Sequence, residues 1–117
     1  MHRYKELKFW QRSRVFCKEI YVSTNKFPKE EKFGLISQLR RASISIPSNI
    51  AEGASRKSNK DFSRFLTLAL GSCYEIETQL LISYDLEFID EKNLNFLVEE
   101  LNQIIKMMSK FNSSLNF

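Results

Sequence analysis

The 117-residue sequence contains only three glycines, two prolines, two cysteines and one histidine. So little glycine and proline excludes collagen-like repeats and long flexible linkers. No apolar run approaches the roughly 18 residues that a membrane-spanning helix needs, and the charged N-terminal segment lacks the apolar core of a signal peptide. We therefore expect a single domain over residues 1–117, in a cytoplasmic protein with no membrane partner.

The sequence also has few of the residues that catalysis and metal binding usually need. The single histidine, His2, lies at a chain end, where mobility is common. We find no glycine-rich phosphate loop and no cluster of residues with metal-ligand spacing. Cys17 and Cys73 lie far apart within helical apolar patterns, which predicts free, buried thiols in a reducing compartment. We expect no enzyme activity and no cofactor.

Apolar residues recur with the period of an α-helix along four segments, and no strand pattern is present. The first helix is expected over residues 4–25, before Phe27-Pro28, because the residue that precedes a proline is disfavoured in a helix. The fourth begins after the capping residue Asp90, and residues 112–117 are expected to fray. Short connections favour an all-α, antiparallel up-down-up-down four-helix bundle.

The second helix is expected over residues 32–52, with Pro47 in its interior. Because the apolar stripe keeps its phase across the proline, the sequence favours one helix bent at Pro47. The alternative is two shorter helices broken at Ser45-Ile46. Gly53 is expected to adopt the left-handed conformation that commonly follows a helix end.

The third helix is expected from a Ser58 cap to about residue 86. Its residues include a heptad seam with alternating spacings of four and three: Phe62, Leu66, Ala69, Cys73, Ile76, Leu80 and Ser83. Other apolar residues lie beside the seam and at the back of the helix. A helix that is apolar on so many sides is normally buried on two of them. A four-helix monomer covers only one side well, so we expect a homo-oligomer.

Positive charge is concentrated in the first half of the chain. Residues 1–64 contain 15 Lys and Arg against 6 Asp and Glu, a net charge of +9, whereas residues 65–117 contain 3 against 8, a net charge of −5. This asymmetry indicates either an anionic partner for the first half or attraction between the two halves, within one chain or between copies.

Two basic clusters are the candidate nucleic-acid site, because Lys and Arg neutralise the phosphate backbone. Their residues are Lys5, Lys8, Arg12, Arg56, Lys57, Lys60 and Arg64. We expect only Tyr4, among the aromatic residues, to be free to stack on a base, and therefore little sequence preference. The first hypothesis is an oligomeric bundle that binds RNA or DNA. The alternative is a scaffold or adaptor whose basic half docks an acidic partner protein.

A polar stripe runs beside the apolar stripe of the second helix. We expect a structural network within it, with Arg41 paired to Glu77 or Glu52 at a helix interface, within or between subunits. The expected members of this network are Arg41, Ser45, Asn49, Glu52 and Glu77. A catalytic or ligand site is the other interpretation, but no nucleophile or titratable base accompanies these residues.

Several longer motifs occur in a fixed order along the chain. They are YKELKFWQ at residues 4–11, Ile20-Tyr21 with Thr24, Phe27-Pro28, Gly34-Leu35, QLRRA at residues 38–42, SIP at residues 45–47, NIAEG at residues 49–53 with Arg56, Phe65-Leu66, Gly71-Ser72 and EIETQL at residues 75–80. This series resembles the four-helix bundle proteins that are encoded in intervening sequences of 23S ribosomal RNA genes. The match covers almost the whole chain, and the fourth helix carries none of the motifs.

The resemblance implies an antiparallel four-helix bundle that assembles into a ring-shaped homopentamer, and it implies no enzyme activity. Accessory proteins of diversity-generating retroelements are distantly similar, and they work beside a reverse transcriptase with RNA. Nucleic-acid binding is thus an expectation that the resemblance supports.

Overall fold

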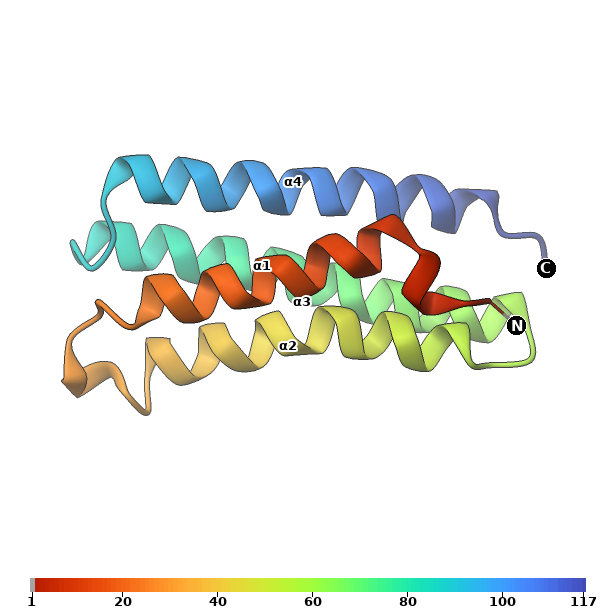
Figure 1. Cartoon of the computed structure of the whole chain (residues 1–117), viewed down its shortest axis with the longest axis horizontal. Helices are drawn as coiled ribbons and strands as arrows, with labels where there is room; N and C mark the ends of the chain where they lie inside the picture. The colour runs from red at the N-terminus through yellow and green to blue at the C-terminus, as the bar shows by residue number, and fades with distance from the viewer. Residues whose placement is uncertain (1) are drawn as a thin grey trace.

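Four α-helices account for most of the computed structural model, which describes residues 2–117 and leaves Met1 outside (Figure 1). They are α1 (Lys8–Thr24), α2 (Leu35–Ala54), α3 (Asn59–Asp85) and α4 (Glu91–Ser114), with short 3-10 turns η1 (Tyr4–Glu6) and η2 (Lys29–Glu31). Consecutive helices run in opposite directions, and α1 also packs against α4. The prediction of an all-α four-helix bundle is confirmed.

The start of the chain differs from the expected single helix over residues 4–25. Leu7 has an extended conformation and separates η1 from α1. His2 is not a loose end, because its backbone N–H donates to the carbonyl of Ala54 at 3.1 Å. Its ring lies 4.9 Å from that of Phe62 and 5.7 Å from that of Phe111. The N-terminal segment is therefore docked on the end of the bundle.

The second helix continues through Pro47 as one element, so the alternative of two shorter helices is wrong. Gly53 lies in its last turn with an ordinary negative φ, which corrects the expected left-handed conformation. The physical role of Gly53 is close packing. A Cβ at this position would lie 2.6 Å from the Phe65 Cβ and 2.9 Å from the Phe62 Cδ1. The missing side chain lets α3 approach the α2 backbone.

Both predicted caps are present: Ser58 Oγ accepts from the Asp61 N–H at 3.1 Å, and Asp90 Oδ1 accepts from the Asn93 N–H at 2.7 Å. The left-handed residue occurs at the end of α3, where Glu87 has a φ of 64°. There the Phe88 N–H donates to the Ser83 carbonyl, and the Glu87 N–H donates to the Tyr84 carbonyl. This pair of bonds is a Schellman motif. The last helix continues to Ser114, beyond the start of the expected frayed segment.

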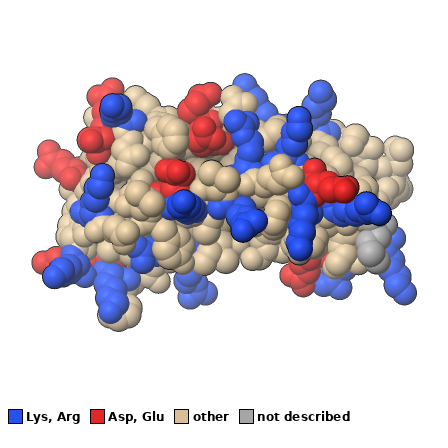
Figure 2. Space-filling model, viewed as in Figure 1, with Lys and Arg blue, Asp and Glu red and all other residues tan. Residues whose placement is uncertain are grey.

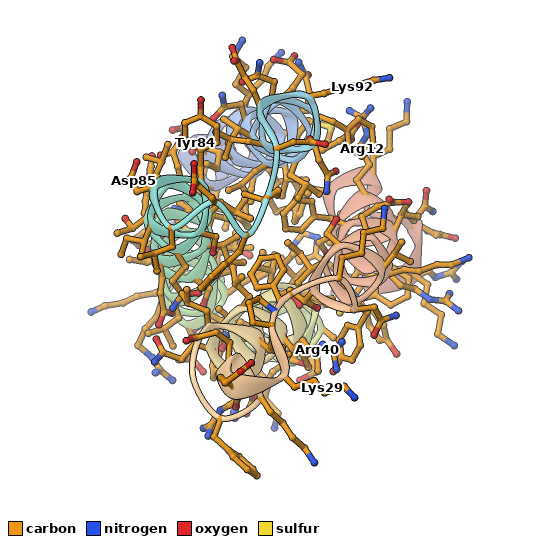
Figure 3. All side chains as sticks on the ribbon, turned by 90° about the vertical axis from the view of Figure 1, so that its left-hand side faces the viewer. Arg12, Lys29, Arg40, Tyr84, Asp85 and Lys92 are labelled. Atoms are coloured by element: carbon orange, nitrogen blue, oxygen red, sulfur yellow. The ribbon has the colours of Figure 1, made fainter. Side chains whose placement is uncertain are left out.

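The heptad seam of α3 forms the centre of the core, and all seven of its residues are buried. Apolar residues of the other helices surround it, among them Phe16 and Ile20 of α1, Leu39 of α2 and Leu101 of α4. Viewed end-on, the four helices stand at the corners of a four-sided bundle, and side chains fill its interior (Figure 3). Within residues 2–117, no helix is long and apolar enough to cross a membrane.

The contact at Gly53 can be tested by adding a methyl group. Gly53→Ala should reduce the free energy of unfolding by about 1–3 kcal/mol, because the new Cβ overpacks the contact with Phe62 and Phe65. Gly71→Ala is the matched control, since a Cβ there would meet no atom within 4 Å. The control should stabilise α3 by about 0.5–1 kcal/mol through helix propensity. Urea unfolding of both variants measures the difference, and equal effects would contradict the packing role.

Candidate nucleic-acid interface

Three segments meet at one end of the bundle: the N-terminus, the α2–α3 connection and the C-terminus (Figure 1). The His2–Ala54 hydrogen bond joins the first two. The third is held by Asn59, whose side-chain Nδ2 donates to the carbonyl of Asn116 at 3.1 Å. Both predicted basic clusters therefore belong to the same end of the molecule.

An open hollow of about 850 Å³ lies at this end, over the α2–α3 connection and the first turns of α3. Four of its lining residues are cations, namely Arg56, Lys57, Lys60 and Arg64, and one is a carboxylate, Asp61. Hydroxyl groups of serine and threonine and the ring of Phe117 complete the wall. We call this feature the basic hollow. It contains four of the seven residues of the candidate nucleic-acid site.

Two of these cations are held in place by α3. The guanidinium carbons of Arg56 and Arg64 lie 4.8 and 4.5 Å from the centre of the Phe65 ring. Asp61 lies 3.1 Å from Arg64 Nη2 and 3.7 Å from Arg56 Nε, and Glu52 lies 3.0 Å from Arg56 Nη2. These partners restrict the two arginines and neutralise part of their charge.

The two lysines of the hollow have no such partner. Lys57 and Lys60 are exposed, and neither takes part in an ion pair among the described residues. A lysine ammonium on a flexible stem interacts with a phosphate as a point charge. The lysines are therefore the freest cations of the basic hollow.

The remaining three candidates are exposed on the N-terminal segment and do not line the hollow. Lys5 lies in η1, where its carbonyl accepts a hydrogen bond from Gln11 Nε2, and Lys8 begins α1. Arg12 projects from the side of α1 that faces α4, away from the α2–α3 pair (Figure 3). Figure 2 shows that Lys and Arg project along much of the face on which α1 lies, where Asp and Glu are fewer. These three residues share the end of the bundle but not the hollow.

The expectation about aromatic side chains is wrong. Tyr4 is half-buried and packs edge-on against Trp10, with 5.1 Å between the ring centres. Phe117 is instead 76% exposed and lines the basic hollow, while Phe33, at the opposite end of the bundle, is 87% exposed. Phe117 lies in the segment that was expected to fray, and no pattern in the sequence indicated that its ring would line a hollow. Its place in the hollow follows from the Asn59–Asn116 contact.

The polar stripe does not form the expected network within one chain. Glu52 pairs with Arg56, and Arg41 is exposed without an ion pair among residues 2–117. Glu77 is half-buried and has no basic partner within the same residues. The intramolecular Arg41–Glu77 or Arg41–Glu52 pair is thus wrong, because the Arg41 side chain faces solvent in the single chain and Glu52 pairs with Arg56. A pair between subunits stays a prediction.

Uncharged side chains make the polar contacts between α2 and α3. Ser45 Oγ donates to Ser72 Oγ, and Gln79 Nε2 donates to Gln38 Oε1 at 3.3 Å. Asn49 Nδ2 donates to the carbonyl of Ser45 at 2.8 Å, a bond within α2. The stripe therefore contributes to helix packing without a buried charge.

Arg40, which was not among the predicted residues, joins α2 to α1. Its Nε donates to Thr24 Oγ1 at 2.9 Å, and its Nη2 donates to Asn25 Oδ1 at 3.0 Å. The guanidinium carbon lies 4.5 Å from the centre of the Tyr21 ring. The positions of Thr24 and Tyr21 in the stripe of α1 indicated that a polar partner could lie there. The rotation of α2 about its axis, which the sequence does not show, decides that this partner is Arg40 and not Arg41.

The thiols are free, as predicted, but differ in environment. Cys73 is buried in the core, and this burial raises the pKa of its thiol from 9.0 to about 12. Cys17 is only half-buried and accepts a hydrogen bond from Ser43 Oγ at 3.4 Å, which corrects its expected burial. Within residues 2–117, no three His, Cys, Asp or Glu side chains are grouped so as to hold a metal ion.

The neighbouring arginines of α2 should differ in their contribution to stability. Arg40→Ala should lower the free energy of unfolding by about 1–3 kcal/mol, because it removes charged hydrogen bonds and an aromatic contact. In a chain whose Arg41 has no partner from another copy, Arg41→Ala should change it by less than about 0.5 kcal/mol, as expected for an exposed side chain. Denaturant unfolding of both variants provides the comparison. A larger loss for Arg41→Ala would indicate a buried partner from another copy.

Comparison with known proteins shows the family. The model of the 23S rRNA-intervening sequence protein family matches residues 5–110. The fold is similar to the crystal structure of a protein of unknown function from the S23 ribosomal protein family of Bacteroides thetaiotaomicron, with a TM-score of 0.81 and 23% identity over 91% of this chain and 99% of that one. No curated protein matches the chain. Because the family model spans most of the sequence, the chain belongs to the 23S rRNA-intervening sequence protein family.

Proposed function

We propose that the protein is a non-enzymatic, self-associating helical bundle that binds RNA in the cytoplasm through the basic hollow and the N-terminal cations beside it. The observation that carries this proposal is the gathering of four basic side chains around one open hollow that is lined by one acidic side chain, Asp61. The family name refers to sequences that interrupt 23S rRNA, which makes RNA the first nucleic acid to test.

The arrangement suits a phosphate backbone better than a small molecule. The hollow is open to solvent, and its four basic side chains come from the α2–α3 connection and the first turns of α3. Such a surface offers charge and hydroxyl donors, which contact phosphate and sugar without reading base edges. Binding should therefore weaken steeply as salt rises and show little sequence preference.

Exposed apolar side chains on α3 support self-association. Tyr74 and Leu81, two helical turns apart, are each about half exposed, as are Leu68, Ile82 and Leu86 on the other outer side of the helix. A second copy is the proposed occupant of the Tyr74–Leu81 side, because the acidic second half of one chain complements the basic first half of another. Contacts between unlike surfaces form a ring when the rotation between copies closes, and the resemblance gives five as the number of copies.

The alternative is a protein–protein scaffold without a nucleic-acid role. The observation that favours it is Phe33, which is 87% exposed in the loop before α2, at the end opposite to the basic hollow. A large apolar side chain at a loop tip is a common anchor for a protein partner.

Charge reversal tests the RNA proposal. The Lys57→Glu/Lys60→Glu variant should bind a labelled RNA more weakly than the wild type. Its slope of log affinity against log salt should be shallower by about one to two, because binding releases fewer counterions when phosphate contacts are lost. Fluorescence anisotropy over a series of KCl concentrations measures both quantities.

The matched control is Lys29→Glu/Lys32→Glu, which makes the same charge change in exposed residues at the opposite end of the bundle. It should leave most of the affinity and the slope in place. Equal losses in the two variants would indicate only a general charge effect. Absence of RNA and DNA binding by the wild type at low salt would favour the scaffold.

Light scattering tests self-association. The wild type should have the mass of five chains, and Tyr74→Lys/Leu81→Lys should have the mass of one, because the substitutions place charge on a surface that must be desolvated. Phe96→Lys on α4 is the control, since it places charge on a similarly exposed apolar residue outside the basic first half. A monomeric wild type would overturn the assembly, and a monomeric control with an intact α3 variant would move the interface to α4.

A further inference from the structure

Phe117 gives the basic hollow a property that phosphate binding alone does not require. Its ring is 76% exposed and shares the hollow with Arg56, Lys57, Lys60 and Arg64. The Asn59–Asn116 hydrogen bond ties the segment beside it to the first residue of α3. An exposed aromatic ring thus lines the same hollow as the four cations.

This combination is what proteins use to bind single strands. A groove of positive charge follows the backbone, and an aromatic ring stacks on a base without reading its identity. Bases in a duplex are already stacked on each other and cannot offer a face to the ring. A site that contacts only phosphates gains nothing from an unpaired base, and therefore does not favour a single strand over a duplex.

We infer that the basic hollow binds single-stranded RNA, with one unpaired base stacked on Phe117 and the adjacent phosphates on Lys57 and Lys60. This inference rests on the proposed function, because it assigns the form of nucleic acid to the same hollow. Arg56 and Arg64 contribute positive charge at fixed positions, since Phe65 and Asp61 hold them. The two lysines, without ion-pair partners among the described residues, adapt to the path of the backbone.

The test compares three labelled RNA probes of equal length by fluorescence anisotropy: an oligouridine strand, the same strand with abasic sites, and a duplex. Oligouridine has little internal stacking, so its bases are free. The wild-type protein should bind the oligouridine about 5- to 150-fold more tightly than the abasic strand, the range expected for one stacked base. It should also bind the oligouridine more tightly than the duplex.

Phe117→Ala should bring the affinity for oligouridine down to that for the abasic strand. Its salt slope should not change, because the phosphate contacts remain. Phe117→Trp should restore the preference. Phe33→Ala is the matched control, since it removes another highly exposed phenylalanine from the opposite end of the bundle, and it should keep the wild-type preference.

The outcomes separate this inference from the proposed function. Equal wild-type affinity for the abasic and oligouridine strands, or a preference for the duplex, would overturn base stacking and leave phosphate binding intact. Oligouridine binding that Phe117→Ala leaves unchanged would remove Phe117 from the site. Failure of all three probes to bind at low salt would overturn the proposed function as well.

Discussion

The candidate interface depends on the close approach of the last turn of α2 to the first turns of α3. Because Gly53 has no side chain, Phe62 and Phe65 pack directly against the α2 backbone. This contact positions Phe65 through its Cβ, and the guanidinium groups of Arg56 and Arg64 lie against the Phe65 ring. A packing constraint at the end of the core thus determines where two surface charges stand. The position of the basic hollow is a consequence of how the bundle closes.

Asp61 orders the basic hollow but also reduces its positive charge. Its backbone N–H completes the Ser58 cap, and its carboxylate contacts both arginines, so it orders the start of α3 and the hollow together. The same carboxylate lowers the net positive charge that attracts an anion. Lys57 and Lys60 supply charge that no carboxylate of residues 2–117 offsets through an ion pair. The hollow therefore combines a rigid part, built on Phe65 and Asp61, with a flexible part made of lysines.

The features that the sequence predicted correctly depend on local chemistry. The Ser58 and Asp90 caps each require one hydrogen bond three residues along the chain, and the α3 seam follows from helix periodicity alone.

The errors concern the rotation of helices and contacts between distant segments. One residue corresponds to about 100° around a helix, so a pattern that describes the whole of α2 does not decide whether Arg40 or Arg41 meets α1. Gly53 was predicted to be left-handed because glycine often follows a helix end. Its actual role is close packing against residues of α3, which are distant from it in the helix pattern. The four basic residues of the hollow were predicted from the sequence, whereas the hollow itself and the place of Phe117 in it were not.

The location of the basic hollow at an end of the bundle determines how the proposed self-association and the proposed RNA binding would combine. The exposed apolar residues of α3 lie along the side of the molecule, whereas the hollow lies where α2 turns into α3. Contacts along the helix sides leave such an end open. In a ring whose copies point the same way, every hollow lies on one rim, because rotation repeats each surface at the same height. A strand that engages one hollow is then held near the next at a high effective concentration. For the proposed assembly, weak individual sites of this kind predict tight binding only to strands long enough to span neighbouring copies. The length of the RNA, rather than its sequence, would then be the property that the proposed ring selects.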